Sequence, residues 1–276
     1  MKISISLLSL FSAILLTSSI SQHETALVNC NDYQISEIEE LDLSSQGLTN
    51  IPDSVFLMKN LKILNLQHNQ LRKISPKIKN LQNLEILKLR SNRLQYIPEE
   101  IYELKKLKFL EFAMCFDIKE ISKNITKLQN LEHLDLFCNK IKKLPNEFCA
   151  LKKLKHLELS NNRFEELPKC ISELNSLEYF SYFGTGINYF HLGICEMIRL
   201  KELRIGANDI YTVPDCVSKL VNLEYIDLKN TYLKSLPQEL INLPKINNIR
   251  IQNLEISQSE LDMLKKDYKH IYLSRG

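Results

Sequence analysis

The sequence contains no tryptophan, few glycines and almost no net charge. Only 6 of its 276 residues are glycine, which excludes a glycine-rich linker and a collagen-like tract. Its 36 lysines and arginines nearly balance 33 aspartates and glutamates, so the formal net charge is +3. This balance argues against a protein that holds nucleic acid by bulk positive charge, and we expect no nucleic-acid partner. Hydrophobic residues at 44% and charged residues at 25% exclude wholesale disorder.

The chain has no apolar run long enough to span a membrane, but its N-terminus has the features of a secretory signal peptide. Lys2 precedes an apolar run of about 14 residues, whereas a membrane-spanning helix needs roughly 20. Ser19 and Ser21 match the small-x-small rule for signal peptidase, which places cleavage near Ser21. We therefore expect residues 1–21 to be removed and the mature protein to be secreted, without a membrane span. An uncleaved anchor helix is the alternative.

One pattern, L-x-x-L-x-L-x-x-N-x-L, fills most of the remaining chain. Successive copies are separated by 23 residues, except for one interval of 24. A fixed period of this length with this signature indicates a leucine-rich repeat solenoid, so we expect one elongated domain over residues 38–256. The repeats begin at Ile38, Leu61, Leu84, Leu107, Leu131, Leu154, Leu177, Leu200, Leu223 and Ile246.

The residue types within one repeat predict its local structure. Leu87 and Leu89 alternate with outward residues, which is strand periodicity, and Asn92 is expected to turn inward and satisfy backbone groups. Pro98 then begins a predicted short helix over residues 99–106, with acidic residues first and lysines last, as the helix dipole favours. The predicted fold is α/β: a curved horseshoe with a parallel sheet on its concave face and short helices on its convex face.

The repeats resemble the 23-residue leucine-rich repeat class whose convex segment reads L-P-x-x-I. Residues 98–101 and 168–171 carry that segment here. The class includes Ras-group scaffold repeats, plant intracellular repeat proteins and bacterial repeat proteins. The resemblance implies protein–protein binding on the concave face. The class is mostly intracellular, whereas this chain carries a predicted signal peptide. Secreted animal relatives usually have caps with clustered cysteines, but the N-terminal flank of this chain has only Cys30.

Both ends of a solenoid need a cap over the exposed core. Residues 22–37 are the predicted N-terminal cap. Residues 257–260 read as a capping box, and Leu261, Leu264, Tyr268 and Ile271 follow at helical spacing. We therefore predict a C-terminal capping helix over residues 257–276. A membrane-surface helix is the competing interpretation of this segment.

The outward positions of the central strands combine aromatic and acidic residues. Aromatic residues at this density indicate a binding surface, although single exposed apolar residues are common on any protein. The acidic residues beside them favour a protein ligand with hydrophobic and basic residues. The predicted ligand-binding residues are Phe109, Glu111, Met114, His133, Asp135, Phe137, His156, Glu158, Tyr179, Phe183 and Tyr225.

Two His-x-acid pairs on adjacent predicted strands, His133 with Asp135 and His156 with Glu158, are close enough to converge on one zinc ion. No second shell is evident, and we expect neither a metal nor a cofactor. Residues 183–186 lack the third glycine and the lysine of a phosphate-binding loop. No nucleophile–base set lies outside the repeat pattern, so we expect no enzyme.

The 7 cysteines cannot all pair within one chain. Cys149 and Cys170, like Cys195 and Cys216, are 21 residues apart, and Cys115 precedes Cys138 by 23. An offset of two residues between neighbouring coils places the 21-spaced pairs near or beyond the roughly 6.8 Å Cα limit, so we expect mostly free thiols. The only N-glycosylation sequon begins at Asn124, on the predicted convex side.

These patterns favour a secreted, monomeric, non-catalytic protein-interaction module that binds a protein on its concave face. One alternative is an intracellular or host-directed scaffold of GTPase-type signalling, which the resemblance to Ras-group repeats implies. A remote alternative is a metal-dependent hydrolase that uses His133, Asp135, His156 and Glu158.

Overall fold

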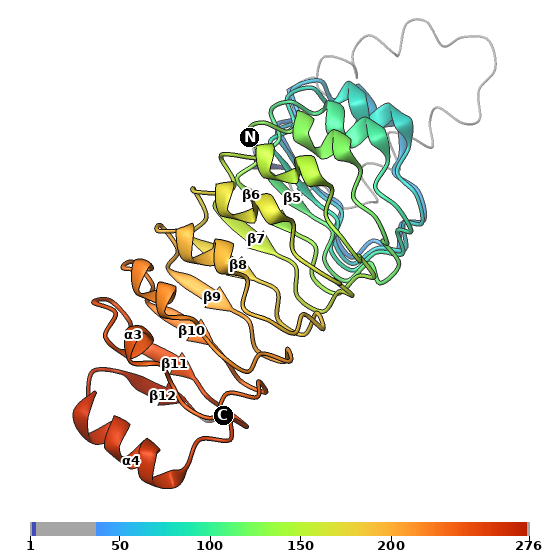
Figure 1. Cartoon of the computed structure of the whole chain (residues 1–276). Helices are drawn as coiled ribbons and strands as arrows, with labels where there is room; N and C mark the ends of the chain where they lie inside the picture. The colour runs from blue at the N-terminus through green and yellow to red at the C-terminus, as the bar shows by residue number, and fades with distance from the viewer. Residues whose placement is uncertain (1, 4–36, 275–276) are drawn as a thin grey trace, which may run out of the picture.

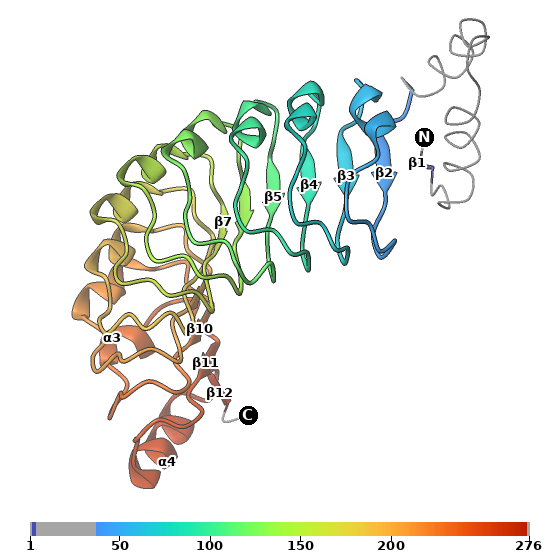
Figure 2. The ribbon, with the colours of Figure 1, turned by 90° about the vertical axis from the view of Figure 1, so that its right-hand side faces the viewer.

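The structure, a computed structural model, describes residues 2–3 and 37–274 as a curved solenoid (Figure 1). Its strands form one parallel sheet whose spatial order follows the chain. Figure 2 shows the strands on the inner side of the curve and the short helices on the outer side, which confirms the predicted fold class. Most of the predicted signal peptide and N-terminal cap lies outside the described residues. The strands are β1 (Lys2–Ile3), β2 (Glu40–Asp42), β3 (Ile63–Asn65), β4 (Ile86–Lys88), β5 (Phe109–Glu111), β6 (His133–Asp135), β7 (His156–Glu158), β8 (Tyr179–Ser181), β9 (Glu202–Arg204), β10 (Tyr225–Asp227), β11 (Asn248–Arg250) and β12 (Tyr272–Ser274).

Each of the predicted repeats contributes one short strand whose central residue enters the core. Leu87 and Leu89 are fully buried, while the strand residues beside Leu87 are half-exposed. The pairing is in register, so Leu87 lies opposite Leu64 on one side and Leu110 on the other. Equivalent leucines therefore stack along the solenoid axis, and each buried leucine contributes about 2 kcal/mol of transfer free energy.

Buried asparagines support the turn after β3, β4, β6, β7 and β9, as predicted for Asn92. The Asn92 Nδ2 donates to the carbonyls of Leu66 and Leu89, both at 2.9 Å. Its Oδ1 accepts the backbone N–H of Leu71 at 3.1 Å. One amide thus joins two coils and satisfies backbone groups that would otherwise be buried without partners.

The convex segments are mainly 3₁₀ helices, and they are shorter than the sequence predicts. The helix after Pro98 covers Glu99–Glu103, not residues 99–106, and Pro98 precedes it in an extended conformation. Leu104 and Leu107 are both fully buried, so the chain must leave the helix to bring both into the core. Lys105 and Lys106 consequently lie past the helix end, and the predicted lysines in its last turn are absent. The convex helices are η1 (Asp53–Leu57), η2 (Pro76–Asn80), η3 (Glu99–Glu103), η4 (Lys123–Lys127), η5 (Asn146–Ala150), η6 (Lys169–Glu173), η7 (Leu192–Glu196), η8 (Asp215–Lys219) and α3 (Gln238–Ile241).

The C-terminal cap is a helix followed by a strand. Helix α4 (Gln258–Asp267) begins at Ser257, whose Oγ accepts the N–H of Glu260 at 3.2 Å. The predicted helix to residue 276 is too long, because Ile271 turns into the core and β12 then pairs with β11. A paired edge and a packed helix together close this end of the solenoid. None of the helices in the described residues has the length and apolar character that a membrane crossing requires.

The second position of the repeat alternates in charge from Glu39 to Glu224 along one edge of the sheet. Exposed glutamate–lysine pairs with N–O distances of 2.7–2.8 Å join Glu39 to Lys62, Glu85 to Lys108, Glu132 to Lys155 and Glu178 to Lys201. Such exposed pairs contribute about 0–1 kcal/mol each. Their main consequence is that the charges along this edge are neutralised within the chain.

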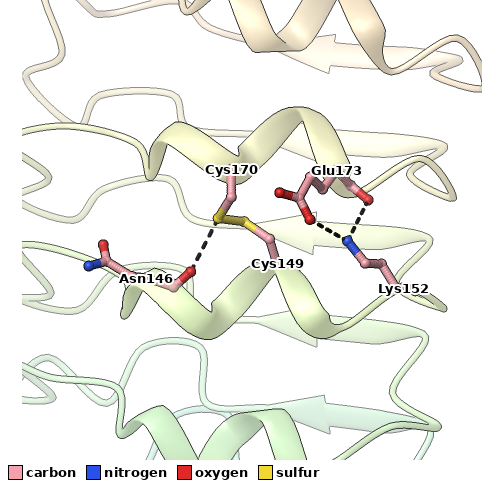
Figure 3. Close-up of a disulfide and its surroundings, with 5 residues drawn as sticks. All are labelled: Asn146, Cys149, Lys152, Cys170 and Glu173. Carbon is pink, nitrogen blue, oxygen red and sulfur yellow. Dashed lines mark hydrogen bonds and ion pairs between the residues drawn. A yellow bond between two sulfur atoms is a disulfide. The ribbon is translucent and has the colours of Figure 1, made fainter.

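Two disulfides join neighbouring convex helices, which corrects the expectation of mostly free thiols. Cys149 pairs with Cys170 at a Cα–Cα distance of 5.9 Å (Figure 3), and Cys195 pairs with Cys216 at 5.7 Å. The prediction failed because it treated the coil as extended. Two residues of a 3₁₀ helix advance only about 4 Å, against nearly 7 Å in a strand. The 21-residue spacing therefore places both cysteines of each pair within bonding reach.

Candidate functional site

All eleven residues of the predicted ligand site lie on β5, β6, β7, β8 and β10 or directly after these strands. The in-register pairing places equivalent positions side by side, because Phe109, His133, His156 and Tyr179 are successive partners across the sheet. The site therefore occupies the middle of the concave face. Each of these five strands has a buried leucine, phenylalanine or isoleucine at its centre, which anchors the outward side chains.

Four aromatic rings form a continuous stack across these strands. The centroid distances are 4.0 Å from Phe109 to His133, 3.9 Å from His133 to His156 and 3.9 Å from His156 to Tyr179. The interplanar angles are 11°, 12° and 5°. We call this set the ring stack. Sequence reasoning placed its members on one face but did not foresee the stacking, although four aromatic or imidazole rings at the third position of consecutive repeats were the available signal.

The stack makes both imidazoles uncharged at neutral pH. Burial, with a smaller contribution from Lys88, lowers the pKa of His133 to about 4. Burial, followed by the charges of His133 and Arg204, lowers the pKa of His156 to about 3. The rings lie face to face and do not converge on a common point. The described residues contain no group of three or more histidine, cysteine or acidic side chains placed to hold a metal ion.

Cationic side chains cover both ends of the ring stack. The Lys88 Nζ lies 5.8 Å from the ring centroid of Phe109. At the other end, the Arg204 guanidinium lies 5.7 Å from the Tyr179 ring and 5.4 Å from the Tyr225 ring. Through these cation–π contacts, the aromatic surface continues from Lys88 on β4 to Tyr225 on β10.

The three predicted acidic residues lie side by side in the next row, but their surroundings differ. Glu111 is buried and compensated, because Gln67 Nε2 donates to it at 2.6 Å and Arg90 lies 3.9 Å away. Glu158 accepts the Tyr179 hydroxyl and the Ser160 N–H, both at 2.7 Å.

Asp135 lies between these two carboxylates and accepts only the N–H of Phe137, at 2.8 Å, among the interactions of the described residues. Burial, followed by the charges of Glu158 and Glu111, raises the pKa of Asp135 to about 6. Its carboxylate is therefore the one in this row whose charge is least stabilised.

The remaining predicted anchors flank this row. Phe137 and Phe183 are half-buried at the seventh position, and Lys229 Nζ lies 4.6 Å from the Phe183 ring centroid. The Met114 sulfur accepts from the Arg90 guanidinium at 3.3 Å. These contacts fix the side chains while part of each remains accessible.

The two irregular repeats border the site. Cys115 replaces the asparagine of the 24-residue repeat, and its Sγ donates to the carbonyls of Leu89 at 3.7 Å and Ala113 at 4.0 Å. In the next repeat, the buried Asn139 Oδ1 has no hydrogen-bond partner among the described residues. In the other irregular repeat, Thr185 donates its hydroxyl to Tyr182 O at 2.9 Å, and Gly184 and Gly186 have positive φ. Residues 183–186 are thus a turn of the repeat.

Asn124 lies on the convex side, in η4, as predicted. Its Nδ2 donates to Glu99 Oε2 at 2.7 Å, and the side chain is half-exposed. An amide at this position can receive a glycan without contact with the concave face.

Comparison with known families and structures agrees with this geometry. A family model described as a leucine-rich repeat region matches residues 114–205, and a second leucine-rich repeat model matches residues 36–78. No curated protein matches the chain. The chain is therefore a leucine-rich repeat protein.

Solved structures share the fold at low sequence identity. The internalin InlF from Listeria monocytogenes is 18% identical, with a TM-score of 0.64 over 91% of this chain and 83% of its own. The functional domain of InlJ from the same bacterium is 17% identical, with a TM-score of 0.64 over 81% of this chain and 55% of its own. The plant peptide hormone receptor RGFR1, solved in complex with RGF2, is 25% identical, with a TM-score of 0.58 over 74% of this chain and 38% of its own.

Proposed function

We propose that this protein is a non-catalytic, secreted interaction module that binds a protein ligand on its concave face. The observation that carries the proposal is the ring stack, with half-exposed Phe137 and Phe183 beside it. The leucine core does not require aromatic residues at these outward positions. Aromatic anchors surrounded by polar groups are the usual composition of an energetically dominant binding surface.

The uncharged imidazoles support a protein ligand. Because both rings are neutral at pH 7, the stack offers apolar edges and hydrogen-bonding nitrogens without a charge to desolvate. The receptor RGFR1, a structural neighbour, is solved with the peptide RGF2 bound. A peptide or protein segment is therefore the ligand class that we propose here.

Two features support secretion. The N-terminus has the pattern of a signal peptide, two disulfides join the convex helices, and disulfides persist in oxidising compartments. The disulfides also weigh against a cytosolic scaffold of GTPase-type signalling. Expression in a secretory cell should yield protein in the medium that begins near Gln22 and carries a glycan on Asn124. An unprocessed cytosolic product that retains Met1 would contradict this part of the proposal.

The binding face is tested by capture of extracellular proteins through chemical crosslinking. Proteins that the unmodified chain enriches should be lost with the Phe137→Ala, Phe183→Ala double variant. They should be retained with Tyr96→Ala, which removes an exposed aromatic side chain outside the concave row. If the double variant retains its partners while Tyr96→Ala loses them, the concave-face assignment is wrong.

A further inference from the structure

The concave face carries a specific order of charges that its own side chains leave uncompensated. Within residues 37–274, Lys88 and Lys229 form no ion pair, and their ammonium groups lie over the rings of Phe109 and Phe183. Asp135 and Glu158 likewise form no ion pair and accept hydrogen bonds only from neutral donors, although the charge of Arg90 acts on Asp135 from a longer distance. Between β4 and β10, the other concave charges form ion pairs, as in the pairs Arg250 with Asp227 and Arg204 with Glu202. From β4 to β10, the charges without an ion pair therefore run basic, acidic, basic.

We infer that the ligand presents an extended segment that crosses the strands and carries a central arginine or lysine with an acidic residue on each side. This inference rests on the proposed function, because it specifies the occupant of the same face. The complementary order acidic, basic, acidic places each ligand charge opposite a free charge of the opposite sign. A polyanion such as RNA does not fit, since the central carboxylates would face its phosphates.

The strand spacing gives the separation of the charges on such a segment. Lys88 and Asp135 occupy equivalent positions two strands apart, which is about 9.6 Å at ~4.8 Å per strand. Glu158 and Lys229 belong to repeats three strands apart, which is about 14 Å. An extended chain advances about 3.3 Å per residue. In the expected ligand, the basic residue thus lies about three positions from one acidic residue, and the second acidic residue lies about four to six positions further on.

The site between His133, His156 and Asp135 suits the central cation. The aliphatic stem of a lysine or the plane of an arginine can lie along the ring stack, whose imidazoles do not repel it because they are neutral. Among the three carboxylates of this row, Asp135 has the fewest groups that stabilise its charge. A ligand cation should therefore bind more strongly beside Asp135 than beside Glu111, which already interacts with Arg90 and Gln67.

This arrangement makes binding depend on pH. The charged groups that act on Asp135 are Glu158 on β7, Glu111 on β5 and Arg90 after β4, and the two stacked histidines lie two residues before Asp135 and Glu158 on the same strands. The pKa of Asp135 is about 6, whereas the histidines have pKa values of about 4 and 3 and stay neutral between pH 5 and pH 7. A bound cation favours the ionised carboxylate, so ligand affinity should fall as the pH drops through 6.

A random peptide library displayed on phage tests the charge order on the intact protein. The full span from Lys88 to the β10 strand is about 29 Å, so peptides of about twelve residues cover it. At pH 7.4 the enriched peptides should carry the acidic, basic, acidic order at the stated spacings at least tenfold above its frequency in the library. Enriched peptides with the basic, acidic, basic order or no charge preference would overturn the inference, and so would a library that yields no enriched peptide.

Variants of the protein separate this inference from the proposed function. The best peptide should bind Asp135→Asn about tenfold more weakly, and the remaining affinity should no longer decrease between pH 7 and pH 5. Asparagine can still accept the Phe137 N–H, so the strand end is preserved. The matched control, Asp215→Asn on the convex helix η8, should bind as the unmodified protein does.

Failure of the proposed function and failure of the inferred charge order give different results. If the enriched peptides bind the Phe137→Ala, Phe183→Ala variant unchanged, they occupy another surface and the proposed function fails. If that variant loses them but Asp135→Asn binds them as tightly as before, the concave face binds ligands and only the inferred charge order is wrong.

Discussion

The imidazole rings of His133 and His156 lie face to face on adjacent strands, with centroids 3.9 Å apart and planes within 12° of parallel. Each ring is covered by its neighbour, so protonation of either one would place a cation in a partly buried stack beside a second imidazole. This contact keeps both imidazoles uncharged at neutral pH and also couples the stability of the fold to pH.

The histidine stack predicts that the protein loses stability in mild acid. Both folded-state pKa values, about 4 and 3, lie below the usual 6.5, so protons bind the unfolded chain more readily. The histidine contribution to stability is therefore complete above pH 6.5 and decreases as the pH falls from 6.5 towards 4. Asp135 acts in the opposite direction, because its raised pKa favours the folded state as the pH falls from 6 towards 3.8. The stability lost through the two histidines is larger than the stability gained through Asp135. The temperature at the midpoint of thermal unfolding should therefore be lower at pH 4.5 than at pH 7.

The His133→Phe, His156→Phe double variant provides the matched comparison. Phenylalanine retains the stack between Phe109 and Tyr179 but has no titratable group. Thermal unfolding of this variant should show a smaller acid-dependent decrease in the midpoint, or none. An equal decrease in both proteins would show that other groups cause the acid sensitivity.

The repeat period makes much of this site predictable. Because parallel strands pair in register every 23 residues, residues at one position of the repeat share a column, and the aromatic residues and acids were assigned to the concave face on that basis. The stacking was not predictable, since it depends on side-chain rotamers. The disulfides were missed because the rise per residue of the convex segment depends on whether it is 3₁₀ or extended. Strand β12 carries no repeat signal and was therefore read as part of a helix.

Each disulfide should stabilise the protein measurably. Cross-linking residues 21 apart removes loop entropy worth about 3 kcal/mol from the unfolded chain. The free energy of unfolding of the Cys149→Ser, Cys170→Ser variant should therefore be lower by about 3 kcal/mol, so this variant should unfold at a lower urea concentration. Reductant should have less effect on this variant than on the unmodified protein. The exposed pair Lys152 and Glu173 joins the segment just after η5 to the end of η6 (Figure 3), and its loss in Lys152→Ala should cost no more than about 1 kcal/mol. A disulfide variant as stable as Lys152→Ala would contradict this.

The two free thiols of the described chain should differ sharply in reactivity. Burial raises the pKa of Cys115 to about 12, and its side chain is only 2% exposed. Cys138 is half-exposed at the end of β6. Thiolates are the reactive form, so alkylation of the native protein without reductant should modify Cys138 and spare Cys115 until the protein unfolds. Peptide mapping by mass spectrometry distinguishes the two sites, and rapid native labelling of Cys115 would contradict its buried position.

Removal of one buried asparagine should destabilise the solenoid more than its size suggests. In Asn92→Ala, the carbonyls of Leu66 and Leu89 lose their donor and the Leu71 N–H loses its acceptor. A buried polar group without a partner costs about 1–3 kcal/mol, so the total loss should reach about 3 kcal/mol after partial relaxation of the turn. The exposed Asn188 forms no comparable set of backbone bonds, and Asn188→Ala should change the free energy of unfolding by less than about 0.5 kcal/mol.

Urea denaturation measures the free energy of unfolding of both variants. It also tests whether the loss of Asn92 affects the whole solenoid or only the neighbouring repeats. Each repeat contacts only its neighbours, so a weak interface at Asn92 lies between the first repeats and the irregular repeat that carries Cys115. The dependence of the unfolding free energy on urea should decrease in Asn92→Ala, because the N-terminal repeats then unfold separately from the rest. If Asn92→Ala costs less than about 1 kcal/mol and its transition remains as steep as in the unmodified protein, the asparagine row does not have the structural role that its hydrogen bonds indicate.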